Sequence, residues 1–275
     1  MTLRQSQFVP PVPLIVAEAY GLLDHVALST RRTSGSPQQL AELLAGEIDL
    51  AVTAIDNLFA WVPAGADVQL VAQIESTTPL SVFGIGDATT LAELTGRRFA
   101  VDAAANGFAL AARWLLEQAG VHDVRFLEVG GVKERLEALL EGRADATLLG
   151  PPFDAMAVDS GAMLLGSVPE MIPGYPGQGL VARADAIGSG ELAAYLELLQ
   201  VATRIANRLE VAEGIELLVA AGFGKAAGSA WATRPRSLRV PASGLEVLTS
   251  VRSDLDLLPA GVDLADLCAP GCLVR

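Results

Sequence analysis

One pattern occurs twice in this chain. A leucine-rich amphipathic stretch ends at Gly46 and is followed by Asp49 and a short apolar run, and the same order returns at Gly142 and Asp145. Helices commonly end at a glycine in the left-handed conformation, and a short apolar run is typical of a buried strand. In both copies the strand is followed by a loop that can open a further helix. The repeat therefore predicts two related α/β lobes.

Composition and charge agree with a large α/β protein and exclude some classes of partner. The chain has 275 residues, of which 51% are hydrophobic, enough for two cores. Its formal net charge of −13 disfavours binding to nucleic acid or to an anionic membrane through the overall field of the protein. No apolar run approaches the roughly 18 to 20 residues that a membrane span needs.

The N-terminal sequence lacks the apolar core and the cleavage site of a secretion signal. We therefore expect a cytoplasmic protein if the chain is the natural one, and a periplasmic or cell-surface protein if a leader was trimmed. Cys268 and Cys272 are compatible either with thiols or with a small disulfide loop, and without nearby histidines they predict no metal site.

Strands and helices alternate along the chain. Strands are expected at 3–8, 26–32, 50–53, 68–75, 82–85, 98–101, 126–129 and from 180. Helices are expected at 37–46, 108–119, 190–207, 211–221 and 244–257, together with one that ends near residue 20 and one that starts near residue 90. Ser36 is expected to cap the helix that follows it.

Two segments are candidates for binding a ligand. After the strand that ends before Asp102, small residues and Asn106 lead into a helix, whose first amides favour polar or anionic groups. The alternative is an ordinary strand-to-helix turn capped by Asp102 or Asn106. Tyr175 stands in a stretch rich in proline and glycine that we expect to be a return crossover, where the ring either lines a cleft or fills a packing gap.

A family resemblance rests on three stretches. The run from Pro13 to Asp24, the run from Ala45 to Val52, and the ending Leu257-Leu-Pro259 with Asp263-Leu-Ala-Asp266-Leu resemble the substrate-binding proteins of nitrate, sulfonate, taurine and thiamine-precursor importers. The resemblance extends over nearly the whole chain in organisation. It implies a type II periplasmic-binding-protein fold, in which two α/β lobes joined by two crossovers enclose a ligand cleft.

The resemblance also implies a layout. Residues 1–80 and 178–275 should form the first lobe, and residues 81–177 should form an inserted second lobe, with hinges near 79–83 and 176–181. By position in this fold, loops from both lobes should line the cleft. The candidate ligand-binding residues are Phe8, Pro10, Ser34, Gly35, Ser36, Thr53, Asp56, Asn57, Asp102, Asn106, Gly130, Gly150, Pro151, Phe153 and Tyr175.

The candidate loops carry acidic but no basic residues. Asp56, Asp102 and Asp154 would oppose a doubly negative ligand. We therefore expect a small organic ligand that is neutral, zwitterionic, or bears an amine or heterocyclic nitrogen, with Phe8 or Phe153 holding a ring. No cofactor is expected. The resemblance implies a monomer that works as the binding component of an ABC importer and delivers its ligand to a permease.

Two other functions stay open. Decarboxylases and other enzymes of this fold resemble binding proteins, and a carboxylate such as Asp102 or Asp56 is conceivable as their acid–base group. The two histidines, His25 and His122, fall in segments expected to face solvent, and no motif for a metal or a nucleophilic serine occurs. A cytoplasmic ligand sensor without a transporter is the second alternative.

Overall fold

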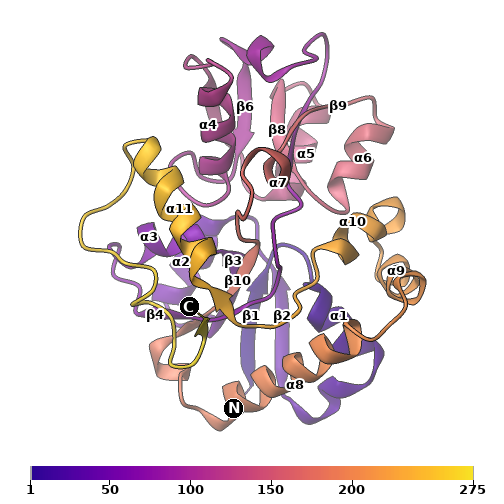
Figure 1. Cartoon of the computed structure of the whole chain (residues 1–275), viewed down its shortest axis with the longest axis vertical. Coiled ribbons are helices and arrows are strands. Elements are labelled where there is room, and N and C mark those ends of the chain that lie inside the picture. Colours follow the sequence, from indigo (N-terminus) through magenta and orange to yellow (C-terminus); the bar gives the residue numbers. More distant parts are fainter. Residues whose placement is uncertain (1, 275) are drawn as a thin grey trace.

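The computed structural model describes residues 2–274 and contains two five-stranded sheets of the same topology (Figure 1). The first has the order β2-β1-β3-β10-β4 and the second β7-β6-β8-β5-β9. In each sheet the first three strands run parallel and the fourth runs antiparallel to both of its neighbours. The strands are β1 (Leu3–Gln7), β2 (Leu28–Arg32), β3 (Leu50–Ala54), β4 (Val68–Gln73), β5 (Ser81–Gly84), β6 (Arg98–Val101), β7 (Arg125–Glu128), β8 (Ala146–Leu149), β9 (Met163–Ser167) and β10 (Gln178–Arg183).

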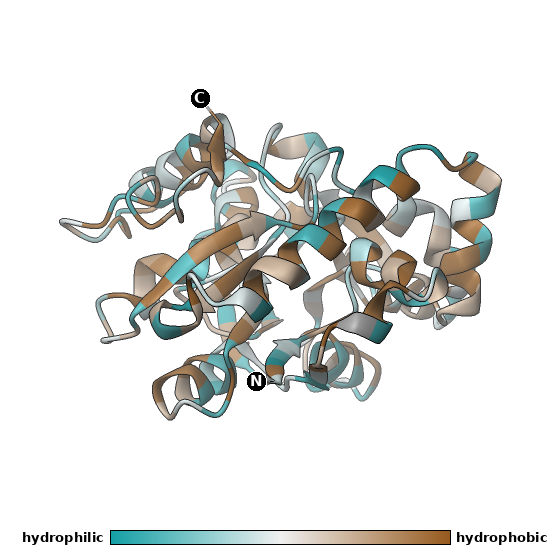
Figure 2. Cartoon of the chain, turned by 90° about the horizontal axis from the view of Figure 1, so that it is seen from below, coloured by the Kyte–Doolittle hydropathy of each residue, from teal (hydrophilic) through white to brown (hydrophobic). Residues whose placement is uncertain are grey.

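Helices cover both sheets. Around the first sheet lie α1 (Val12–Ala19), α2 (Ser36–Leu44), α3 (Leu58–Trp61) and α8 (Gly190–Ala206), and around the second lie α4 (Ala109–Gln118), α5 (Val132–Leu140), α6 (Phe153–Asp159) and α7 (Val168–Met171) (Figure 1). The C-terminal part adds α9 (Val211–Ala220), α10 (Ala227–Ala232), α11 (Ala242–Asp254) and the small ribbon of β11 (Val240–Pro241) and β12 (Leu273–Val274). In Figure 2 hydrophobic and hydrophilic residues alternate along the outer helices, as expected for helices with one face on a sheet.

The repeat marks the same place in both sheets. Gly46 and Gly142 have positive φ angles of 68° and 69° at the ends of α2 and α5. Asp49 then accepts hydrogen bonds from the backbone and the guanidinium of Arg4 on β1, and Asp145 does the same for Arg98 on β6. The repeated acidic residue thus ties the start of β3 to β1 in the first sheet and the start of β8 to β6 in the second.

Most of the elements expected from the sequence are confirmed, with differences at their ends. Thr90 and Glu93 form a capping box, but it heads only the 3-10 turn Leu91–Leu94 rather than a helix. Ser36 is the first residue of α2 and its side chain does not cap it. The expected hinge 176–181 extends into β10, where Gly179 is paired with strands on both sides, and only residues 74–80 and 168–177 run between the sheets outside them.

Among residues 2–274 there is no helix with the length and apolar character needed to cross a membrane. Cys268 and Cys272 are both present as thiols. His122 is exposed, as expected, whereas the side chain of His25 lies outside the described part of the chain.

Candidate ligand-binding site

A cavity of about 100 Å³ lies between the two sheets. By the same measure one water molecule needs roughly 10 to 15 Å³, so the cavity has room for a small organic molecule. It lies beyond the ends of four parallel strands, because Phe8 follows β1, Asn57 follows β3, Asp102 follows β6 and Gly150 follows β8. Strand ends that face one another across a crevice are where open α/β sheets bind ligands.

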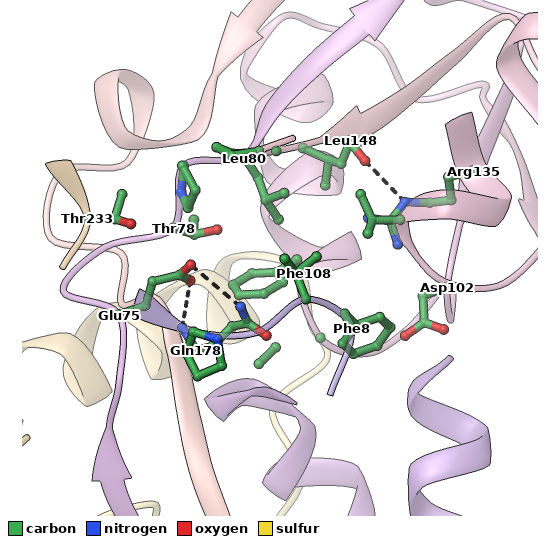
Figure 3. Close-up of a pocket in the computed structure, with 18 of the residues that line it drawn as sticks. Phe8, Glu75, Thr78, Leu80, Asp102, Phe108, Arg135, Leu148, Gln178 and Thr233 are labelled. Atoms are coloured by element: carbon green, nitrogen blue, oxygen red, sulfur yellow. Dashed lines mark hydrogen bonds between the residues drawn. The ribbon is translucent and has the colours of Figure 1, made fainter. Parts of the chain in front are cut away.

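The walls of the cavity are largely apolar. Phe8 and Phe108 line one side and Leu80 and Leu148 the other in the view of Figure 3. Phe223, in the segment between α9 and α10, also lines the cavity. An apolar surface with a few polar groups is typical of a small-molecule site.

Glu75 is the most unusual polar group of the lining. Its carboxylate accepts hydrogen bonds from the backbone amide of Gln178, at 3.1 Å, and from the Gln178 side chain, at 3.5 Å (Figure 3). Burial raises the pKa of Glu75 to about 7, and the bonds from Gln178 offset only part of that effect. Nearby, the buried hydroxyl of Thr78 has no hydrogen-bond partner among the described residues.

The raised pKa of Glu75 predicts that the protein loses stability as the pH rises. An unfolded chain would ionise Glu75 near 4.5, whereas the folded protein holds the proton until about pH 7. Between these values the folded state binds a proton that the unfolded state has lost, so the free energy of unfolding falls with rising pH, by up to about 3 kcal/mol. Glu75→Gln should remove this loss and be the more stable protein at pH 8.

Urea unfolding of the wild type and of Glu75→Gln between pH 4.5 and 8 measures the effect. Glu117→Gln is the matched control, because Glu117 is exposed on α4 and the substitution is the same. If Glu75→Gln and Glu117→Gln show the same pH profile, the Glu75 carboxyl does not titrate in the way described.

Beside the cavity, a buried ion pair joins segments of both sheets. Asp56 accepts from Arg252 on α11 at 2.7 and 2.8 Å, and from the backbone amide of Gly107 at 2.8 Å. Arg252 also donates to Asn106 at 3.2 Å. The side chains of Asp56 and Arg252 are 2% and 5% exposed, so the pair is part of the interior. A Cβ at position 107 would lie 2.8 Å from the Asn57 amide oxygen. Because glycine has no Cβ, the two loops can approach each other closely at this point.

A second contact between the halves is made by Asp102. Both of its carboxylate oxygens accept from the backbone amide of Ser36, at 3.0 and 2.9 Å. The first turn of α2 is therefore capped by a carboxylate from the other sheet. Gly35 allows this approach, since a Cβ there would lie 2.6 Å from an Asp102 oxygen. Gly131 donates to the Ser34 carbonyl at 2.6 Å and strengthens the same junction.

Six of the fifteen residues predicted from the sequence line the cavity: Phe8, Pro10, Asn57, Asp102, Gly150 and Pro151. Six others lie at the contacts between the two halves, where a Cβ at Gly130 would also come within 2.7 Å of the Ser34 carbonyl oxygen: Ser34, Gly35, Ser36, Asp56, Asn106 and Gly130.

The other three pack away from the lining. Thr53 is fully buried in β3, where its hydroxyl accepts from the Asn57 amide at 2.6 Å. Phe153 packs against the cluster around Phe83. Tyr175 is 1% exposed and lies against Phe108, so its ring fills a core position. Of the two roles considered for Tyr175, the structure supports packing.

Several lining residues were not predicted. Glu75 and Thr78 lie on a segment that runs between the sheets, Gln178 is the first residue of β10, and Phe223 and Thr233 lie near α10. For Arg135 the sequence did contain a signal. It falls on the same helical face as Val132 and Leu139, which are buried, and a charged residue on an apolar stripe is seldom placed there without a partner.

Residues 12–165 match the model of the family described as NMT1/THI5 like. This chain belongs to the NMT1/THI5-like family. No curated protein matches the chain.

Solved structures of several proteins share the fold. The alkanesulfonate-binding protein SsuA from Xanthomonas axonopodis pv. citri, bound to MOPS, is 22% identical with a TM-score of 0.77, and the match covers 98% of each chain. The zinc-bound ligand-binding component of an ABC-type import system from Staphylococcus aureus is 18% identical with a TM-score of 0.79, over 99% of this chain and 98% of the other. The desulfurization enzyme DszB is 17% identical with a TM-score of 0.66, over 98% and 96%.

These likenesses confirm the expected fold class, the type II periplasmic-binding-protein fold with two α/β lobes and two crossovers. The lobe around the first sheet is called the first lobe below, and the lobe around the second sheet the second lobe. Among the described residues, no group of three or more His, Cys, Asp or Glu side chains is arranged to hold a metal ion.

Proposed function

We propose that this protein binds a small organic molecule between its two lobes and serves as the substrate-binding component of an ABC importer. The observation that carries the proposal is the cavity itself, which is lined by residues of both lobes and combines apolar walls with a few buried polar groups. Such a site is completed only when the lobes meet, so binding and closure are coupled. The family membership and the binding function printed for SsuA and for the Staphylococcus aureus component support this role.

The moving parts proposed for this closure are residues 1–80 with 178–275 and residues 81–177. Support comes from the strand order, in which β1 to β4 and β10 form one sheet and β5 to β9 the other. The ligand expected from the sequence is neutral, zwitterionic, or bears an amine or heterocyclic nitrogen, and of these classes a zwitterion is favoured. The cavity lining contains Arg135, but Asp102 and Glu75 lie there as well. A monomer is proposed as the working form.

Trp114 offers a direct test. It lies on α4 in the second lobe, and its indole nitrogen donates to Asp254 on α11, which follows the first sheet, at 2.9 Å. Trp61 and Trp231 are each only 1% exposed in the core. A ligand that stabilises the closed state should therefore change the fluorescence of Trp114 in a saturable way. Screening a metabolite library by thermal shift and repeating the hits by fluorescence measures this.

Trp114→Phe is the control. It should lose the fluorescence response and keep the binding heat measured by calorimetry. A library that yields no saturable ligand, or ligands whose binding leaves Trp114 and the solution scattering unchanged, would contradict binding between the lobes.

Catalysis is the second candidate, because Glu75 has a pKa of about 7 and lines the cavity, as a general acid or base would. The enzyme DszB shares the fold. Mass spectrometry of each bound compound after prolonged incubation separates the two functions. A binding protein returns the compound intact, whereas an enzyme returns product at a rate that Glu75→Gln lowers.

A further inference from the structure

Arg135 is a buried cation without an acidic partner. The residue is 7% exposed, and its Nε donates to the carbonyl of Leu148 at 3.1 Å. No described residue accepts a hydrogen bond from either of its Nη atoms, and no described carboxylate forms an ion pair with it. A buried charge without a partner destabilises the folded protein, which suggests that a ligand compensates it.

The acidic residues near Arg135 are already engaged. Glu134, its neighbour on α5, pairs with Arg32 at 2.6 Å. Asp102 receives the Ser36 amide on both oxygens. Their fields act on the Arg135 guanidinium, but burial has the larger effect and lowers its pKa below the usual value. The Nη atoms therefore remain available to a further acceptor.

That acceptor would have to come from the cavity. Arg135 lines it, and in Figure 3 its guanidinium lies at one end of the site, next to Leu148 and on the same side as Asp102. Glu75 and Thr78 lie at the other end, and the rings of Phe8 and Phe108 lie between the two ends in this view. The site thus has a guanidinium and a carboxylate at one end, an apolar middle, and a group able to donate or accept a proton at the other end.

The geometry of the guanidinium selects the acceptor. With Nε bound to the Leu148 carbonyl, the edge formed by the two Nη atoms is the one left for a ligand. This edge presents two parallel N–H groups, which match the two oxygens of one carboxylate. A dianion would meet the negative charge of Asp102 as well, and one guanidinium does not compensate both of its charges.

We propose that Arg135 is the carboxylate-binding residue of this cavity, and that the ligand is a monocarboxylate whose ring-sized apolar body lies between Phe8 and Phe108. The assignment rests on the proposed function, since it names the ligand class of that site. Its closest alternative is a sulfonate, which also has one negative charge but has three oxygens and no planar pair.

Benzoate and benzamide are suitable probes, because they have nearly the same shape and differ in charge. Titration calorimetry at pH 7 should show benzoate binding more tightly than benzamide by about 10- to 100-fold, the range for a hydrogen-bonded charged group. Arg135→Met keeps an apolar stem of similar length and should remove that preference, so that benzoate binds no more tightly than benzamide. Arg135→Lys keeps the charge without the paired donors and should restore only part of it.

Lys133→Met is the matched control. Lys133 is exposed on the same helix, so this variant removes one positive charge without touching the cavity, and it should keep the benzoate preference. Arg135→Met should also unfold at the same or a higher temperature than the wild type, because a buried unpaired charge has been removed. A merely structural role of Arg135 predicts a lower unfolding temperature together with an unchanged benzoate-to-benzamide ratio.

Three results would overturn the assignment. They are benzoate binding that is undetectable or no tighter than that of benzamide, a preference for benzoate that survives Arg135→Met, and tighter binding of benzenesulfonate than of benzoate. The carboxylate site and the proposed function can be refuted independently of each other. A library ligand that changes the Trp114 signal but binds equally well to Arg135→Met would refute the carboxylate site and leave binding between the lobes intact.

Discussion

Replacing Arg252 with leucine should lower the free energy of unfolding by about 3 to 5 kcal/mol. The reason is the Asp56 carboxylate, which is 2% exposed and receives two of its hydrogen bonds from this guanidinium. In Arg252→Leu the backbone amide of Gly107 is the remaining donor to a buried negative charge. Urea unfolding at pH 7 measures the loss.

A more exposed ion pair of similar geometry serves as the control for Arg252→Leu. Arg98 and Asp145 form the same two-bonded contact, at 3.1 and 2.7 Å, but their side chains are 41% and 23% exposed. Arg98→Leu should therefore cost no more than about 1 kcal/mol. Adding Asp56→Asn to Arg252→Leu should recover part of the loss, because the buried charge is then gone. Equal losses for Arg252→Leu and Arg98→Leu would contradict the account of the buried pair.

Gly214→Ala should destabilise the protein by about 1 to 3 kcal/mol, although alanine is the better helix former. Gly214 lies inside α9, where a Cβ would come within 2.0 Å of the Trp231 ring on α10. Trp231 is 1% exposed and has little room to move. Because Phe223 and Thr233 flank α10 and line the cavity, the variant should also disturb that wall. Thermal unfolding and the probe titrations report the two effects.

Gly228→Ala, in the neighbouring helix, should have the opposite effect on stability. Gly228 lies inside α10, and a Cβ there would meet only Ile215 at an ordinary 3.9 Å. Gly228→Ala should therefore stabilise the protein by about 0.5 to 1 kcal/mol through helix propensity alone. If both variants change stability in the same direction, close packing of Trp231 on α9 is not what requires glycine at position 214.

The architecture could be predicted from the sequence because each copy of the repeat involves only residues of its own lobe. Gly46 and Gly142 each end a helix, and the acidic residue that follows is bonded within its own sheet. These relations depend on residues of one lobe, where periodicity and turn chemistry are informative. The loops that follow the parallel strands were likewise predicted, and Phe8, Asn57 and Asp102 lie at the cavity.

The rest of the site depends on contacts between segments far apart in the sequence. Glu75 meets Gln178 across 103 residues, and Asp56 meets Arg252 across 196. No local pattern indicates such pairs. Ser36 has the sequence signature of a helix cap, yet its side chain does not cap α2, and its own backbone amide is bound by Asp102 of the other lobe. The loops contain no basic residue, but Arg135 reaches the cavity from the helix α5.

The central claim is that a small molecule is held between the two lobes, and the most direct measurement is a crystal structure of the protein after incubation with a metabolite extract. The account predicts density for one intact organic molecule between Arg135 and Glu75, with an apolar part against Phe8. Density for a molecule bound elsewhere on the surface, with the cavity holding only water, would contradict it.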